Sequence, residues 1–249
     1  MGEITFAAIS DIGKTRKVNQ DRWLADPEQG LYLVADGLGG HAAGDVAAQF
    51  VVELFPKVLR DELTGISDLA QPEAAQAVSR AVEKVSQRLW DAAAKRASQQ
   101  GMGSTIVLAL VRESRALIAH LGDSRAYLRR GNDLRPITND HSLVQLLLDS
   151  GRISATEAAR HPSRGKLLRF AGMSDPAVAE VQLLDLQSGD RVLMCSDGLS
   201  GMLNDAQMEF ILRVEPELEK ACDSLVAAAN EAGGRDNITA LMVAIDDLS

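Results

Sequence analysis

The sequence predicts an α+β fold in which a core of two β-sheets is covered by helices. Apolar runs with the length of strands recur from the beginning of the chain to its end, and they are more numerous than one sheet easily holds. Runs that follow each other across short turns should pair as antiparallel strands. The predicted helices come in pairs, which is typical of helices that cover the face of a sheet.

Composition limits the class of protein. The chain has 249 residues, 46% of them hydrophobic and 24% charged, which suits one large domain with a real core. The net charge of -9 argues against a nucleic-acid partner held through its phosphates. The two cysteines do not suggest a disulfide framework, so we expect a reducing cytoplasm. The first residues do not resemble a signal peptide, and the longest apolar run, residues 106–111, is too short to cross a membrane.

The first half of the chain combines strands with two long helices. Residues 4–9, 23–25 and 31–35 are apolar runs bounded by polar turns, and the last two runs should form a hairpin. Residues 42–63 and 72–98 carry apolar side chains at helical spacing, so each should bury one face.

The rest of the chain continues the same alternation. Three consecutive runs, at residues 105–111, 116–120 and 126–130, are joined by short turns and should be antiparallel neighbours. Ser154 and Glu157 form a capping box that should open a helix. The other predicted elements are helices at 143–148, 204–213 and 216–232, and strands at 178–184, 191–195 and 238–245.

Four aspartates stand where predicted strands end or begin. Asp36 follows an apolar run and precedes Gly37, and the pattern D-G-L-x-G returns at Asp197. Asp123 lies between two strands, and Asp236 precedes the last one. An Asp-Gly pair after a strand is equally typical of a hairpin turn. If the fold gathers these strand ends at one edge, however, the carboxylates repel each other unless cations lie between them, and oxygen ligands favour Mg²⁺ or Mn²⁺.

Two basic features have a structural as well as a functional interpretation. Arg16 lies in a polar loop with Asp21, where it either forms a surface ion pair or binds an oxyanion through its planar guanidinium. The segment from Arg160 to Arg169 is the most basic part of an acidic chain. It is either ordinary surface charge or a cover that meets a phosphorylated substrate.

Eight short motifs resemble, in order, those of the metal-dependent protein phosphatase family of the 2C type in its compact bacterial form. They are R-x-x-N-Q-D at 16–21, V-A-D-G-x-G-G-H at 34–41, G-S-T at 103–105, H-L-G-D-S-R at 120–125, D-H-S-L at 140–143, H-P-x-R at 161–164, C-S-D-G-L at 195–199 and G-G-R-D-N-I-T at 233–239. Each motif is weak alone. Eight in family order over nearly the whole chain are very specific.

The resemblance implies a four-layer α-β-β-α sandwich, in which two stacked antiparallel sheets are flanked by helices and a flap lies near residues 142–175. Residues 1–249 would form one catalytic domain. The implied enzyme is a serine/threonine phosphoprotein phosphatase that hydrolyses phosphoserine and phosphothreonine by direct attack of a metal-bridging water, without a phosphoenzyme. It would be a cytoplasmic monomer that acts on phosphorylated proteins and reverses a bacterial serine/threonine kinase.

The resemblance also assigns roles to residues. It implies two or three Mn²⁺ or Mg²⁺ ions with Asp36, Gly37, Asp123, Asp197 and Asp236 as ligands, and Arg16, Asp21 and His41 as catalytic groups. Asp36 would bridge two ions, with the Gly37 carbonyl on the second. Asp123 would share a third, weaker ion with Asp197. Arg16 would orient the phosphoryl oxygens.

The same comparison leaves the proton donor open. Animal members of the family carry a histidine directly after the Asp-Gly pair, where this chain has Leu38. His41 is near in sequence but begins the next helix, so a capping role is as well supported as an acid role, and a water on the third ion is a further candidate. Asp45 replaces a glutamate that many bacterial members have.

Three other functions compete with a general phosphatase. A regulatory phosphatase of narrow range would use the same residues on one partner. A phosphoprotein-binding module would keep the fold without turnover, but the intact metal positions weigh against it. A metal-dependent nuclease is disfavoured by the acidic balance.

Overall fold

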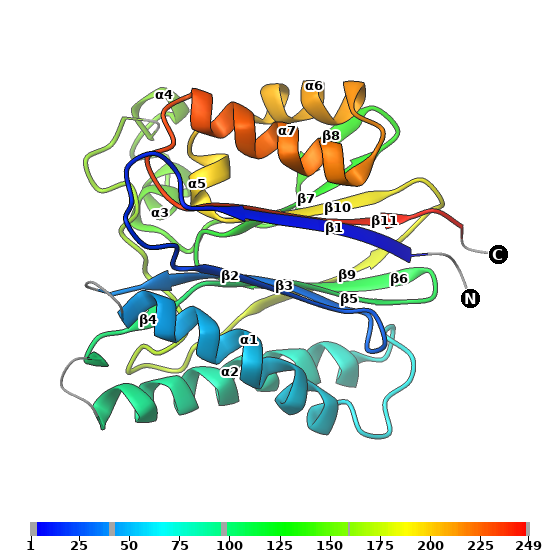
Figure 1. Cartoon of the computed structure of the whole chain (residues 1–249). Coiled ribbons are helices and arrows are strands. Elements are labelled where there is room, and N and C mark those ends of the chain that lie inside the picture. Colours follow the sequence, from blue (N-terminus) through cyan, green and yellow to red (C-terminus); the bar gives the residue numbers. More distant parts are fainter. Residues whose placement is uncertain (1–3, 40–42, 96–98, 159, 248–249) are drawn as a thin grey trace.

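Two antiparallel sheets are stacked face to face, and helices cover both outer faces (Figure 1). This computed structural model describes residues 4–39, 43–95, 99–158 and 160–247. The predicted four-layer α-β-β-α sandwich is confirmed. Its layers place the two ends of the described chain side by side, because the first strand and the last strand are neighbours in one sheet.

The elements have the following bounds. The first sheet contains β1 (Ile4–Asp11), β7 (Arg125–Arg130), β8 (Asp133–Pro136), β10 (Arg191–Cys195) and β11 (Ile238–Ile245). The second sheet contains β2 (Asp21–Asp26), β3 (Leu31–Leu38), β5 (Ile106–Arg112), β6 (Arg115–Leu121) and β9 (Glu180–Asp185), with β4 (Gly103–Ser104) beside β3. The helices are α1 (Ala43–Glu62), α2 (Pro72–Ala94), α3 (Leu143–Asp149), α4 (Ala155–Ala158), α5 (Asp197–Ser200), α6 (Asp205–Val214) and α7 (Leu218–Glu231).

Strand alternation divides the interior into three apolar layers. In β11, Ala240 and Met242 point to the layer under α6 and α7, whereas Leu241 and Val243 point to the layer between the sheets. β3 follows the same period of two, with its odd-numbered apolar residues packed under α1 and α2. Both faces of these central strands are buried, which explains why their sequences are continuous apolar runs.

The helices follow the predicted pattern, with differences at their ends. α2 ends at Ala94 and Lys95 is its C-cap, so the predicted helix over 72–98 is too long, and Ser98 lies outside the described residues. α6 begins after Asn204, which forms a complete capping box with Gln207. Among the helices that the structure describes, none is long and apolar enough to cross a membrane.

Three elements were not predicted because they are short. β8 is a four-residue edge strand that ends in Pro136, where a residue without an N–H is tolerated. β4 pairs only two residues with β3. α5 is a single turn that begins at Asp197 directly after β10, so the second D-G-L-x-G motif opens a helix and not a hairpin.

The antiparallel order brings chemically related strand ends to one edge. β3 and β6 are each paired with β5, so both end where β5 begins. β2 begins at the same edge, since Asp21 is opposite Asp36. In the first sheet β10 ends beside the start of β11. The aspartates predicted to cluster are therefore carried to one edge of the sandwich, near α3, α4 and α5 (Figure 1).

The layer between the sheets should dominate stability. Leu241 is fully buried there, and we expect Leu241→Ala to lower the free energy of unfolding by about 2–5 kcal/mol, because truncation leaves a cavity. Leu183→Ala is a matched control, since Leu183 is 41% exposed, and it should cost less than about 1 kcal/mol. Urea denaturation of both variants measures the difference, and equal losses would contradict the layered core.

Candidate active site

Five aspartates from both sheets converge on one edge of the sandwich. Asp21 and Asp36 are direct cross-strand partners in the second sheet. Asp123 follows β6, Asp197 follows β10, and Asp236 precedes β11. Asp21 and Asp123 are buried, while Asp36, Asp197 and Asp236 are half-buried and open to the surface. The structure thus brings together all the aspartates that the sequence placed in one site.

Hydroxyl groups from the first sheet hold Asp21 in place. Its Oδ2 accepts hydrogen bonds from Ser196 Oγ at 2.6 Å and from Thr239 Oγ1 at 2.7 Å. The backbone N–H of Thr239 also donates to Ser196 Oγ. Ser196 directly precedes Asp197, so these bonds fix the position of one carboxylate relative to another across the gap between the sheets.

A second hydroxyl pair links Asp36 to the loop of Asp123. The backbone N–H of Asp36 donates to Thr105 Oγ1 at 3.0 Å, and Thr105 Oγ1 lies 2.7 Å from Ser124 Oγ. Thr105 N–H donates to the Asp36 carbonyl in return. The G-S-T and G-D-S-R motifs therefore include residues that position the carboxylates.

Gly37 is required by close packing. A Cβ at this position would lie 2.0 Å from the Gly44 carbonyl oxygen at the start of α1. Its N–H donates to the Gln20 carbonyl, and Gln20 N–H donates to Asn237 Oδ1 at 2.8 Å. These contacts hold the end of β3 against the segment that carries Asp236.

Burial and mutual repulsion raise the pKa values of these carboxyl groups. Burial is the main cause at Asp21, whose pKa rises to about 6, and at Asp123, whose pKa also rises to about 6 with a further contribution from Asp140. The pKa of Asp36 lies well above its usual range because of burial and then of the charge on Asp21. Asp197 is raised in the same way, by burial and by Asp123.

The donor set fits hard divalent cations. In the part of the chain that the structure describes, Asp21 Oδ1 and Asp197 Oδ1 are buried without a hydrogen-bond partner. Buried oxygens of this kind need compensation, and a cation would supply it while lowering the raised pKa values. All the candidate ligands at this edge are oxygens, which suits Mg²⁺ or Mn²⁺ and not zinc.

Arg16 lies at this site and pairs with one of its carboxylates. Its Nη2 donates to Asp236 Oδ2 at 2.6 Å, and its side chain is half exposed. Asp236, Asp197 and Asp36 all raise the pKa of Arg16, the first through the hydrogen bond. Of the two interpretations of Arg16, the ion pair is therefore made with Asp236 and not with Asp21, whose Oδ2 accepts hydrogen bonds from Ser196 and Thr239.

The remaining predicted residues have different outcomes. His41 lies outside the described residues. In the basic segment, Arg169 pairs with Glu180 at 3.5 Å, and the Arg164 guanidinium lies 3.8 Å from the position of a Cβ on Gly201. Gly201 directly follows α5, the helix that Asp197 opens. This part of the segment thus lies beside the carboxylates.

Sequence reasoning missed the charged pair next to Asp123. Arg125 forms two hydrogen bonds with Asp140, at 2.7 and 2.8 Å. Arg125 is two residues after Asp123, and both members of the pair belong to motifs quoted above, so the motifs were the only available signal. Asp45 forms an ion pair with Arg22 beside the same edge.

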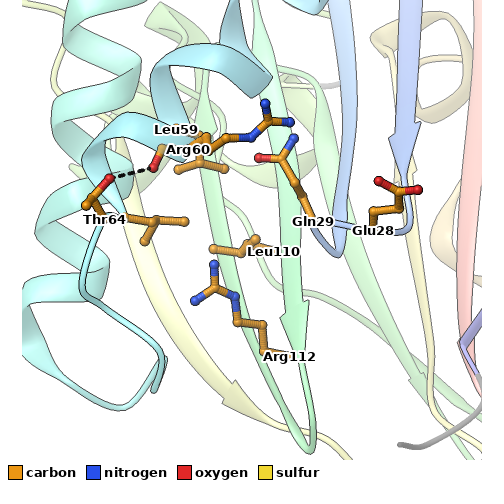
Figure 2. Close-up of a pocket in the computed structure, with 8 residues that line it drawn as sticks. Glu28, Gln29, Leu59, Arg60, Thr64, Leu110 and Arg112 are labelled. Carbon is orange, nitrogen blue, oxygen red and sulfur yellow. Dashed lines mark hydrogen bonds between the residues drawn. The ribbon is translucent and has the colours of Figure 1, made fainter.

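A cavity of about 350 Å³ lies at the other end of the second sheet. Figure 2 shows Leu110 at its floor, with the side chains of Arg60 and Gln29 close together and Arg112 below them. Leu110 is opposite Leu31, at the far end of β3 from Asp36. This cavity contains none of the predicted site residues.

Comparison with known sequences points to one family. The family model "Protein phosphatase 2C" matches residues 13–241. The serine/threonine phosphatase stp of Listeria welshimeri is 37% identical over 237 residues, which cover 94% of this chain and 93% of that protein. The serine/threonine protein phosphatase PstP of Mycobacterium tuberculosis is 35% identical over 98% of this chain but only 45% of its own length.

Solved structures agree with this result. The Mycobacterium tuberculosis phosphatase PstP/Ppp superposes with a TM-score of 0.85 at 33% identity, covering 98% of this chain and 99% of that one. Stp1 from Staphylococcus aureus gives a TM-score of 0.87 at 31% identity, covering 99% and 96%. A further structure, of the PstP catalytic domain at 33% identity and a TM-score of 0.85, is described as a complex with two manganese ions and covers 98% and 99%.

Repulsion at the carboxylate cluster predicts an unusual stability profile. In EDTA at pH 7, Asp36→Asn should melt several °C above the wild-type protein, because it removes a charge from the cluster, and 1 kcal/mol corresponds to about 2–4 °C in a chain of this length. Carboxyl groups whose pKa values are raised in the folded protein lower its stability as the pH rises from about 4 to about 6. The difference in melting temperature between Asp36→Asn and wild type should therefore shrink toward pH 4.

The control is Asp190→Asn. Asp190 is buried too, but it is paired with Arg130 at 2.7 Å, so the substitution should lower the melting temperature. Thermal denaturation of the three proteins with EDTA and with Mn²⁺ measures both effects, and only the wild-type and Asp190→Asn proteins should gain strongly from Mn²⁺. A metal-free Asp36→Asn variant that melts below wild type would contradict the proposed repulsion.

Proposed function

We propose how this chain works from the premise that it belongs to the protein phosphatase 2C family and is a serine/threonine protein phosphatase. The substrates are phosphoserine and phosphothreonine side chains of proteins, and the reaction is metal-dependent hydrolysis. The observation that carries the proposal is the cluster of Asp21, Asp36, Asp123, Asp197 and Asp236. In it the carboxylates repel each other, and two buried oxygens, on Asp21 and Asp197, have no hydrogen-bond partner among the described residues.

The cluster would hold Mn²⁺ or Mg²⁺. Asp36, the Gly37 carbonyl, Asp197 and Asp236 would hold two ions, and Asp123 with Asp197 would hold a third. Manganese is supported by the two ions in the related PstP catalytic domain. The bound ions supply an activated water and offset the charge of the phosphoryl oxygens. Asp21 would orient water at the site through its buried Oδ1, since its Oδ2 is occupied by two hydroxyls.

Arg16 would bind the phosphoryl group of the substrate. Its guanidinium already lies 2.6 Å from a carboxylate oxygen of the site, so it can reach a phosphoryl oxygen nearby with little rearrangement. A planar guanidinium also offsets the charge that develops on the phosphoryl oxygens during transfer. His41 remains a candidate proton donor, as does a water at the third ion.

The wider organisation follows from the same premise. We expect residues 1–249 to act as one catalytic domain, with 142–175 as a flap beside the site. The pairing of β1 with β11 supports this proposal, because it joins the first and last described strands in one sheet. A monomeric, cytoplasmic enzyme that reverses a bacterial serine/threonine kinase agrees with the bacterial relatives and with two buried thiols, Cys195 and Cys222, that form no disulfide.

Metal-dependent turnover is the first test. Purified protein should hydrolyse a phosphothreonine peptide with Mn²⁺ or Mg²⁺ and lose this activity in EDTA, and Asp36→Asn and Asp236→Asn should reduce it by at least about 10²-fold because each removes a proposed ligand. Phosphate release is the measurement. Wild-type protein that binds Mn²⁺ but shows no hydrolysis would favour a phosphoprotein-binding module.

Substitution of Arg16 should lower the turnover of substrate more than it lowers the affinity for metal. Arg16→Ala should lower kcat/KM for the phosphopeptide about 10–100-fold, while the Mn²⁺ concentration that gives half-maximal activity changes little. Arg16→Lys should restore only part of the loss, since an ammonium cannot form two parallel hydrogen bonds. Steady-state kinetics at saturating Mn²⁺ measure the effect, and an equal loss of metal affinity would show that Arg16 instead supports Asp236.

A further inference from the structure

The dipeptide Asp140-His141 holds the turn around Asp123 from both sides. On one side Asp140 forms two hydrogen bonds with Arg125. On the other side His141 forms two hydrogen bonds with Gly122. The His141 N–H donates to the Gly122 carbonyl at 2.8 Å, and the Gly122 N–H donates to His141 Nδ1 at 3.2 Å. Asp123 lies between the two fixed residues.

The turn at Gly122 needs this support. Gly122 has a φ of +117°, and a Cβ there would lie 2.7 Å from the Thr105 side chain. The N–H and the carbonyl of Gly122 therefore lie in a tight turn of positive φ, directly before Asp123. Both of them are bonded to His141, so this residue determines where the chain enters Asp123.

Hydrogen bonds assign the tautomer of His141. A backbone N–H can only donate, so Nδ1 is the acceptor and the proton of the neutral ring is on Nε2, which faces Glu180 Oε1 at 3.1 Å. Burial lowers the pKa of His141, and the adjacent His120 lowers it further, which keeps the ring neutral at pH 7. A neutral ring is the form that can accept the Gly122 hydrogen bond.

His120 supports this ring from the side. The two imidazole rings stack with centroids 4.5 Å apart and planes 20° apart, and His120 Nε2 donates to the Asn139 carbonyl at 2.7 Å. His120, His141 and Glu180 together are also a possible zinc ligand set. However, His120 Nε2 already bonds to the Asn139 carbonyl and His141 Nδ1 already accepts from Gly122, so the hydrogen-bonded arrangement is favoured.

His141 also directly precedes the flap. The His141 carbonyl accepts a hydrogen bond from Leu168 N–H at 2.8 Å, and Ser142 is paired with Leu167. The returning segment of the flap is therefore attached to the residue that fixes Gly122. A displacement of the returning flap segment would therefore be transmitted to Gly122 through His141, and a displacement of Gly122 would be transmitted to the flap in the same way.

We propose that His141 is a positioning residue for metal binding at Asp123, which it holds through the Nδ1···H–N bond to Gly122. This inference rests on the proposed function, because Asp123 is a proposed ligand of the third, weakest ion. It predicts that Mn²⁺ affinity at Asp123 depends on a hydrogen-bond acceptor at the Nδ1 position and does not depend on the Nε2 side of the ring, which faces Glu180.

Isosteric substitutions separate the two sides of the ring. Asn places an oxygen near the position of Nδ1, whereas Gln places its amide near Nε2. His141→Ala and His141→Gln should weaken the weakest Mn²⁺ site about tenfold, the effect typical of residues that orient metal ligands, and His141→Asn should stay within about threefold of wild type. Glu180→Gln should leave the site unchanged.

Counting of bound Mn²⁺ by electron paramagnetic resonance is the primary measurement, because it does not depend on turnover, with Asp123→Asn marking complete loss of this site. The Mn²⁺ dependence of phosphopeptide hydrolysis is the second. If wild type binds Mn²⁺ without turnover, the proposed function fails and the binding series still decides this inference. Equal weakening in the Asn, Gln and Ala variants, or no weakening in any of them, would falsify the positioning role.

Discussion

Repulsion among five carboxylates at one edge is the constraint on which the rest of this structure depends. Ionised aspartates this close would separate if their loops were free, since burial adds to their mutual repulsion. Short hydroxyl side chains prevent this. Ser196 and Thr239 hold Asp21, and Thr105 holds Asp36. The fold therefore keeps the cluster in place by hydrogen bonds, some of which cross from one sheet to the other at Asp21 and some of which stay within the second sheet at Asp36.

The layers and the cluster could be predicted from the sequence because both follow from short-range patterns. Continuous apolar runs of strand length locate central strands such as β3 and β11, and an aspartate at each strand end becomes a neighbour of the others once the strands are antiparallel. The motif resemblance supplied the four-layer arrangement, which periodicity alone does not determine. Element ends were less predictable, as the early end of α2 at Ala94 illustrates, because capping depends on local tertiary contacts.

Contacts between distant segments could not be predicted. The sequence offered Asp21, five residues away, as one possible partner of Arg16, but Arg16 pairs with Asp236 near the other end of the chain. Nothing in the sequence around Asp140 or Arg125 distinguishes a half-buried bidentate pair from two surface charges. The stacking of His120 on His141 was equally unpredictable, because it depends on how the flap returns to the sheet.

The position of β11 has a consequence for folding during translation. This strand is formed by residues 238–245, yet it lies between β1 and β10 and adjoins Asp236. The strand β1 must therefore wait for β11, which is synthesised much later, before it can pair with its neighbour in the sheet. A chain that lacks β11 also lacks the strand that separates β1 from β10 and follows Asp236, so we expect the carboxylate cluster to form only after this last strand has been synthesised.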